Sequence, residues 1–198
     1  FIIITSVNAQ NTFLYSVQNL QQTAANKLEF DVYLQDTDVP SFELTSCQLG
    51  FTLNYSIYSG GTLSLTYSNT GSGLNSFQQF NATTTNSIVY PLTGYAGKTL
   101  VRLAGRTPPG AGAGTIISKT SPGTLITHYI LTSTVNFATD VSPDIAFCSS
   151  TVTNPLYPTR VAQYVSGSPA ALTVTSGSNA VVNENPVLNA TITAYNVN

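Results

Sequence analysis

Four of the eight acidic residues in this 198-residue chain lie within 13 positions, and they are the side chains best suited to chemistry. They are Asp31, Asp36, Asp38 and Glu43. Carboxylates from loops are ligands that Ca²⁺ prefers, so the four residues are candidate metal ligands. No calcium-loop motif is complete, and a solvated turn between strands explains the same cluster, so both interpretations stay open. A glycosidase would need two acids about 5–9.5 Å apart across a cleft, whereas these acids lie on one predicted hairpin.

The 11 tyrosines, in a chain without tryptophan, are the second candidate group. Sugar-binding proteins stack aromatic rings on pyranose rings, and tyrosine offers a flat apolar face with a polar edge. Five tyrosines are close enough in sequence to form one carbohydrate-binding surface: Tyr55, Tyr58, Tyr67, Tyr90 and Tyr95. The alternative is that each is an ordinary strand residue, half-buried with its hydroxyl in water.

Residues that could catalyse a reaction are few. The only histidine, His128, lies in the apolar segment 123–134, and no G-x-S-x-G motif supplies an activated serine for a triad. One histidine and two widely spaced cysteines do not provide the four ligands of a zinc site. The glycine-rich segment 106–114 lacks the lysine and the following helix of a phosphate-binding loop, which favours an inter-strand loop. We therefore expect no enzyme activity, and no cofactor apart from the candidate Ca²⁺.

The two cysteines, Cys47 and Cys148, allow two arrangements. In an oxidising compartment they could form a disulfide across a sandwich, or they could be separate buried thiols. Cys47 is in phase with the apolar positions of its strand, whereas Cys148 is out of phase with Ile145 and Phe147. A disulfide would therefore need a bulge that corrects the phase of Cys148.

The elements that position these residues are predicted to be strands. Apolar and polar residues alternate with a period of two in many segments, and no window shows a helical repeat. The segment 123–134 is apolar on both faces, as expected of a central buried strand. About ten strands are expected, including 28–34, 47–53, 63–65, 101–103, 116–117, 123–134, 145–147, 161–165 and 172–174. They predict an all-β fold, an antiparallel β-sandwich of the jelly-roll type.

The composition excludes several partners. Only 7% of the residues are charged, and six Lys and Arg residues cannot form the basic stripe of a nucleic-acid-binding protein or a polybasic membrane patch. Hydrophobic residues make up 42% of the chain, which is enough to fill a core, and no stretch is long enough to span a bilayer as a helix. We expect no nucleic-acid partner and no membrane insertion of the mature domain.

The two ends suggest a secreted piece of a larger protein. Residues 1–9 form an apolar run with small residues at positions 7 and 9, the pattern of a signal-peptide end, so they are interpreted as a signal-peptide remnant. A buried first strand made of Phe1 to Ile4 is the alternative. Residues 10–175 are expected to form the sandwich domain. Residues 176–198 show no strong core pattern and are expected to be a linker or the start of a following domain.

Two strand patterns resemble a known family. The runs Lys27–Leu34 and Phe42–Asn54 resemble the opening strands of cohesin-type domains, which share a jelly-roll sandwich with a group of carbohydrate-binding modules. In that family the second strand ends in Phe-x-Leu-x-Tyr, and Phe51–Tyr55 matches this motif. The run Gly123–Leu131 is similar to a later strand of the family that begins at a glycine. Ser56 stands where the family often has an acidic residue.

One further run, Leu103–Gly110, resembles a segment of extracellular multidomain proteins in bacteria that use a type IX secretion system. Together the resemblances cover about residues 12–175. They imply a non-catalytic extracellular or cell-surface module of a secreted protein, serving in adhesion through a polysaccharide or an extracellular protein partner. A structural spacer or assembly domain without its own ligand is the alternative.

Overall fold

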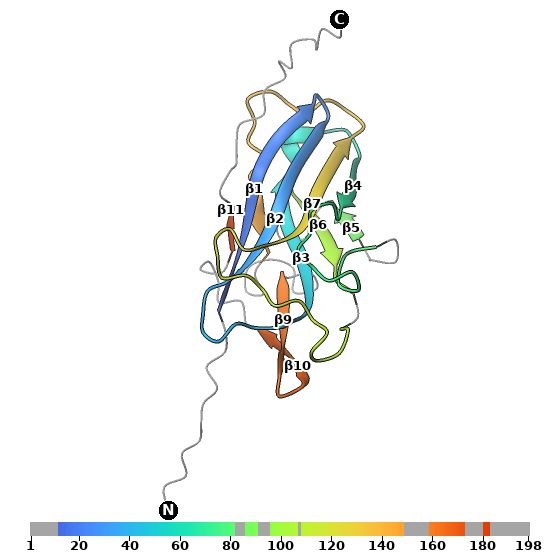
Figure 1. The fold of residues 1–198 in the computed structure, drawn as a ribbon. Coiled ribbons are helices and arrows are strands. Elements are labelled where there is room, and N and C mark those ends of the chain that lie inside the picture. The colour runs from blue at the N-terminus through green and yellow to red at the C-terminus, as the bar shows by residue number, and fades with distance from the viewer. Residues whose placement is uncertain are drawn as a thin grey trace, which may run out of the picture.

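Two β-sheets packed face to face form the described part of the protein (Figure 1). The computed structural model describes residues 12–81, 86–90, 96–106, 108–148, 159–172 and 180–182. The predicted signal-peptide remnant at 1–9 and the candidate Tyr95 lie outside the described residues, as does most of 176–198.

The first sheet has the strand order β11-β1-β2-β7-β4. Its strands are β1 (Phe13–Ala24), β2 (Lys27–Asp36), β4 (Leu63–Ser68), β7 (Thr124–Ser133) and β11 (Ala180–Val182). Neighbouring strands are antiparallel, except that β11 pairs with β1 in parallel. This sheet therefore continues past residue 175, into the range expected to be a linker or the start of a following domain.

The second sheet has the strand order β10-β9-β3-β6-β5, and the short strand β8 pairs with β3. All its pairs are antiparallel. Its elements are β3 (Leu44–Asn54), β5 (Asn86–Val89), β6 (Lys98–Ala104), β8 (Ala146–Phe147), β9 (Arg160–Val165) and β10 (Ser168–Leu172), with the 3₁₀ helix η1 (Tyr55–Tyr58) directly after β3.

The core lies between the sheets, and alternation is clearest in β2, where every second residue is buried. Its apolar residues Leu28, Phe30, Val32 and Leu34 face inward, together with Asp36 at the end of the strand. At the centre, Phe30 of the first sheet lies 5.4 Å from Phe51 of the second, and both rings contact Tyr129. The predicted all-β, two-sheet sandwich is confirmed.

Several strand predictions need correction. The predicted strand 116–117 is absent from the strands described, and Ile116 forms only an isolated antiparallel bridge with Glu43. The segment Phe13–Ala24 was not expected to be a strand, yet β1 is the longest of those described. Its alternation ends at Asn19, whose φ of 55° accompanies a register shift against β2 between Gln18 and Gln21. The prediction that β7 is buried on both faces was also wrong, because His128 and Ile130 on its outer face are only half-buried.

Within the described residues, no helix has the length and apolar character needed to cross a bilayer.

Candidate functional site

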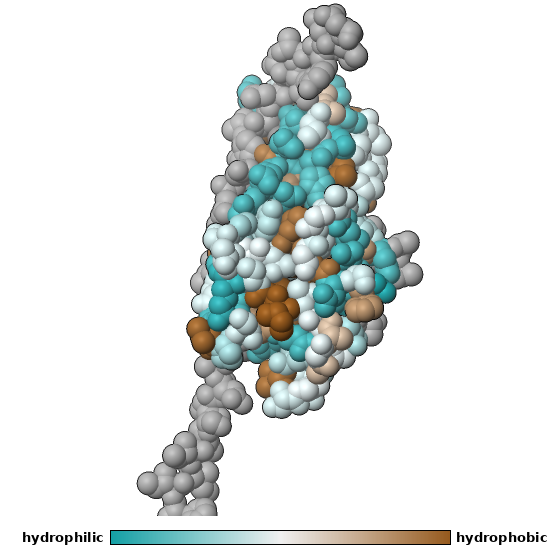
Figure 2. All heavy atoms as spheres, in the orientation of Figure 1, coloured by the Kyte–Doolittle hydropathy of each residue, from teal (hydrophilic) through white to brown (hydrophobic). Residues whose placement is uncertain are grey.

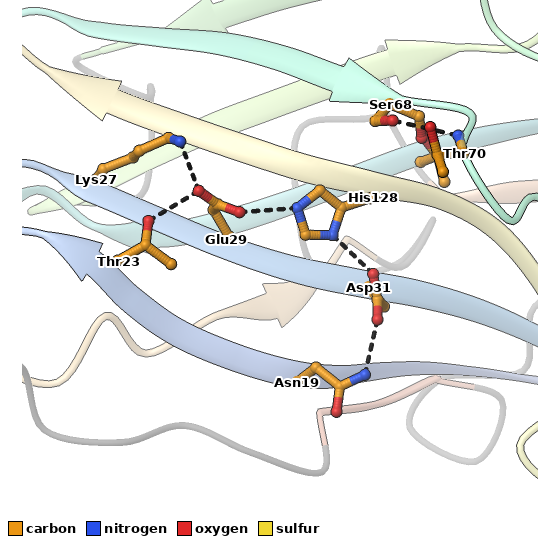
Figure 3. Close-up of polar contacts among 9 residues, drawn as sticks. Asn19, Thr23, Lys27, Glu29, Asp31, Ser68, Thr70 and His128 are labelled. Carbon is orange, nitrogen blue, oxygen red and sulfur yellow. Dashed lines mark hydrogen bonds and ion pairs between the residues drawn. The ribbon is translucent and has the colours of Figure 1, made fainter.

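Polar side chains from three neighbouring strands meet on the outer face of the first sheet (Figure 3). We call this group the His128 cluster. It comprises Asn19 and Thr23 of β1, Lys27, Glu29 and Asp31 of β2, and His128 of β7. Figure 2 shows that hydrophilic residues cover much of the upper half of the face on which β1, β2 and β7 are seen in Figure 1.

His128 bridges two carboxylates. Its Nδ1 lies 2.8 Å from Oδ1 of Asp31, and its Nε2 lies 3.0 Å from Oε2 of Glu29. The strand register explains this geometry, because Asp31 is directly opposite His128 in the β2–β7 pair and Glu29 lies two positions away on the same face.

The second oxygen of each carboxylate has its own donors. Asn19 Nδ2 donates to Oδ2 of Asp31 at 2.7 Å, and Thr23 Oγ1 donates to Oε1 of Glu29 at 2.8 Å. Lys27 Nζ lies 2.6 Å from the same Glu29 oxygen. The register shift that follows Gln18 on β1 lies at Asn19, whose amide reaches Asp31 on the neighbouring strand.

These contacts change the acid–base behaviour of the cluster. The hydrogen bond from Lys27 lowers the pKa of Glu29 to about 2, and the bonds to Thr23 and His128 act in the same direction against partial burial. Partial burial lowers the pKa of His128, but its hydrogen bonds to Asp31 and Glu29 outweigh burial, so the pKa is raised from 6.5. The geometry favours an imidazolium held between two carboxylates.

The four candidate metal ligands have separate partners in the structure. Asp31 belongs to the His128 cluster, and Asp36 is buried, where its carboxylate accepts the backbone N–H groups of Asp38 and Phe42 at 3.0 and 3.1 Å. Oδ1 of Asp38 accepts the N–H of the next residue at 2.7 Å. Within the described residues, no three His, Cys, Asp or Glu side chains form a group that could hold a metal ion.

Glu43 fixes the glycine-rich loop. Its Oε1 accepts the backbone N–H groups of Gly112 at 2.8 Å and Gly114 at 2.6 Å, and the N–H of Gly110 donates to the hydroxyl of Tyr164 at 2.7 Å. Gly112 has a φ of +84°, and a Cβ on Gly114 would lie 2.4 Å from the Leu44 carbonyl oxygen, so glycine is required at both. The N–H groups of Gly112 and Gly114 are thus occupied by a carboxylate of the chain itself, and that of Gly110 by a tyrosine hydroxyl.

The structure gathers three of the five candidate tyrosines. Tyr55 and Tyr90 stack with ring centroids 3.6 Å apart and an interplanar angle of 10°, and Tyr58 packs edge-on against Tyr55 at 5.0 Å. We call these three rings the tyrosine stack. Tyr67 lies apart from it on β4 of the other sheet, where it packs against Phe80.

The two cysteines are buried and are not joined by a disulfide. Cys47 lies in the main core between the sheets, where burial raises its pKa to about 12. Cys148 follows β8, its N–H donates to the Gly50 carbonyl oxygen at 2.8 Å, and it packs with Leu100 in a second cluster. The pairing of β8 with β3 places Cys148 on the face of the second sheet opposite to Cys47, which agrees with its phase in the sequence.

Sequence reasoning did not point to the partners of His128. Charged residues at the alternating positions 27, 29 and 31 were a signal, since they share one face of a strand. Their meeting with His128 depends on the β2–β7 register, which spacing along the chain does not reveal.

The fold and these features define a class, namely an all-β, two-sheet sandwich protein with a polar cluster on one sheet and an aromatic stack at the end of β3. A scan against protein-family models finds no match to this chain, and a search of curated proteins finds none either.

Proposed function

We propose that this chain is a non-catalytic extracellular binding module of a larger secreted protein, and that it binds carbohydrate at the tyrosine stack. The sandwich is of the jelly-roll type in this proposal, similar to cohesin-type and carbohydrate-binding domains. The low charge, the polar uncharged surface and the many tyrosines support a module of this kind.

The observation that carries the proposal is the exposed ring of Tyr90. This residue is 43% exposed, and its ring stacks face to face on that of Tyr55. Such a surface suits contact with the apolar face of a pyranose ring, while the hydroxyl can bond to a sugar hydroxyl.

The stack is already ordered by its neighbours. The hydroxyl of Tyr58 shares a 2.5 Å hydrogen bond with Oγ1 of Thr99, and the hydroxyl of Tyr55 accepts the N–H of Gly60 at 3.1 Å. Rings held in place lose little conformational freedom when a ligand binds, which favours affinity.

The test is a glycan array followed by calorimetric titration of the full chain with the best neutral oligosaccharide. We expect Tyr90→Ala to weaken binding by at least about fivefold, in line with the energy of an aromatic contact, and Tyr90→Phe to retain most of it. Tyr33→Ala is the matched control, because Tyr33 is a half-buried tyrosine on the outer face of the other sheet. A blank array, or equal binding by Tyr90→Ala and the wild type, would refute the proposed site.

One observation favours a protein partner instead. Figure 2 shows hydrophobic residues gathered in the lower half of one face, and Ile116 and Phe77 are 62% and 58% exposed. Exposed apolar area of this kind is typical of protein interfaces. A pull-down from secreted proteins that is lost in Ile116→Ser but unchanged in Tyr90→Ala would support this second function.

A further inference from the structure

The His128 cluster joins β2 to β7 through one ring that contacts two carboxylates. Both contacts have hydrogen-bond lengths, at 2.8 Å to Asp31 and 3.0 Å to Glu29 (Figure 3). The side chains of His128, Asp31 and Glu29 are 26%, 17% and 16% exposed, so water competes only partly for these bonds.

Among the described residues, the charged groups around His128 all come from one strand, β2. Among the strands of the sheet, β1 supplies only the uncharged Asn19 and Thr23, and β4, with Ser68 opposite His128, has no charged residue. The titratable groups on the same face of β2 are Lys27, Glu29, Asp31 and Tyr33. The charge state of His128 is therefore set chiefly by β2.

The number of protons on the ring decides how many contacts can exist. An imidazolium donates from both nitrogens and satisfies both carboxylates. A neutral imidazole donates from one nitrogen only, and the lone pair of the other nitrogen then faces a carboxylate oxygen, which is also an acceptor. One of the two contacts must therefore break when His128 loses a proton.

The remaining donors indicate which contact breaks. Within the part of the chain that the structure describes, Glu29 keeps two other donors, Lys27 and Thr23, whereas Asp31 keeps one, the amide of Asn19. Losing the histidine donor therefore costs Glu29 less. We propose that His128 is a pH-controlled latch, in which deprotonation frees Glu29 from β7 while the Nδ1–H bond to Asp31 stays closed.

The direction of the His128 pKa agrees with this geometry. It is raised from 6.5 in the folded protein. The stabilisation from the doubly bonded ring is thus complete below 6.5 and is lost as the pH rises through the higher folded value. The contact between His128 and Glu29 is therefore present at low pH and absent at high pH.

Nitrogen-15 NMR of the full chain tests the proposal, and it is unambiguous because His128 is the only histidine. We expect both ring nitrogens to carry protons at about pH 5, a titration midpoint above 6.5, and the Nδ1–H tautomer at about pH 9. A neutral Nε2–H tautomer, or a midpoint at or below 6.5, would overturn the latch.

Two variants separate the contacts. Glu29→Gln should lower the midpoint and keep the Nδ1–H tautomer, whereas Asp31→Asn should lower the midpoint and shift the neutral ring toward Nε2–H. Gln35→Ala, on the same face of β2 but away from the cluster, is the control and should change neither. If a variant fails to fold, amide hydrogen exchange of wild-type β2 and β7 gives a second readout. Once the rates are corrected for the intrinsic pH dependence of amide exchange, the protection factors next to Glu29 should fall above the midpoint. Protection factors that do not change across the midpoint contradict the proposal.

Discussion

Replacing Asp36 tests whether the acid-rich segment is a structural turn or a calcium site. The side chain is 1% exposed, and its carboxylate accepts the N–H groups of Asp38 and Phe42 in the turn between β2 and β3. A hydrogen bond to a charged group contributes about 1.5–3 kcal/mol, and a buried donor left without a partner adds its own cost. Since the Asp38 bond is only partly buried, we expect Asp36→Ala to lower the free energy of unfolding by about 3 kcal/mol.

The assay is urea unfolding of the full chain, with and without calcium and with a chelator. With a slope of about 2 kcal/mol per molar urea, the midpoint should fall by about 1.5 M in every condition. Asp36→Asn should lose about half as much, because the amide keeps one acceptor oxygen. Asp38→Asn is the control and should change stability by about 0.5 kcal/mol or less.

Two results would refute this reasoning. If Asp36→Ala cost less than about 1 kcal/mol, the carboxylate would not hold the turn. If the loss appeared only in the presence of calcium, the acids would act as metal ligands, as the sequence pattern alone suggested.

Four further predictions follow from the packing and the charges. Gly114→Ala should destabilise the protein more than Gly112→Ala in chemical unfolding. A Cβ at 114 would lie 2.4 Å from a carbonyl oxygen, whereas a Cβ at 112 would meet nothing within 4 Å and the only cost there is the backbone strain of a φ of +84°. Phe51→Ala should cost about 3–5 kcal/mol by the same assay, since the ring is fully buried between two aromatic neighbours; a cost under about 1 kcal/mol would contradict the core described. Cys47, with its pKa raised to about 12 by burial, should resist thiol reagents in the native protein. Its rate of labelling should equal the rate at which the protein unfolds. Because the pKa of Glu29 is lowered to about 2, its stabilising contribution should be complete above 4.5 and be lost as the pH falls toward 2; Glu29→Gln should flatten that part of the pH–stability curve.

The fold class could be predicted because alternation is a local property of the chain. Leu28, Phe30 and Val32 alternate with polar residues, and this pattern alone places one face of β2 in the core. β1 could not be predicted in the same way, because Asn19 and the bulges beside it interrupt the period. A strand with a bulge stays in its sheet, but the bulge interrupts the alternation of apolar and polar residues from which the strand would be predicted.

The candidate site depended on contacts that spacing does not determine. Clustering in sequence suggested that Asp31 and Asp36 share a site, but they are five positions apart on β2 and therefore point to opposite faces of the sheet. Asp31 binds His128 on the outer face, whereas Asp36 is buried. Conversely, Tyr55 and Tyr90 are 35 positions apart and meet ring on ring, because β5 pairs with β6 and β6 with β3. Pairing of distant strands decides these neighbours, and one sequence contains no direct record of it.

The pairing of β2 with β7 has a consequence for how the chain folds. It joins residues about 100 positions apart, such as Phe30 and Tyr129, so the first sheet cannot grow from neighbouring hairpins alone. The entropy of closing a long loop must be overcome before these contacts form, which places the protein among the slower folders. During synthesis β2 has no partner on its β7 side until residue 133 has emerged. Until that moment its unpaired backbone edge and its apolar face are open to pairing with neighbouring chains.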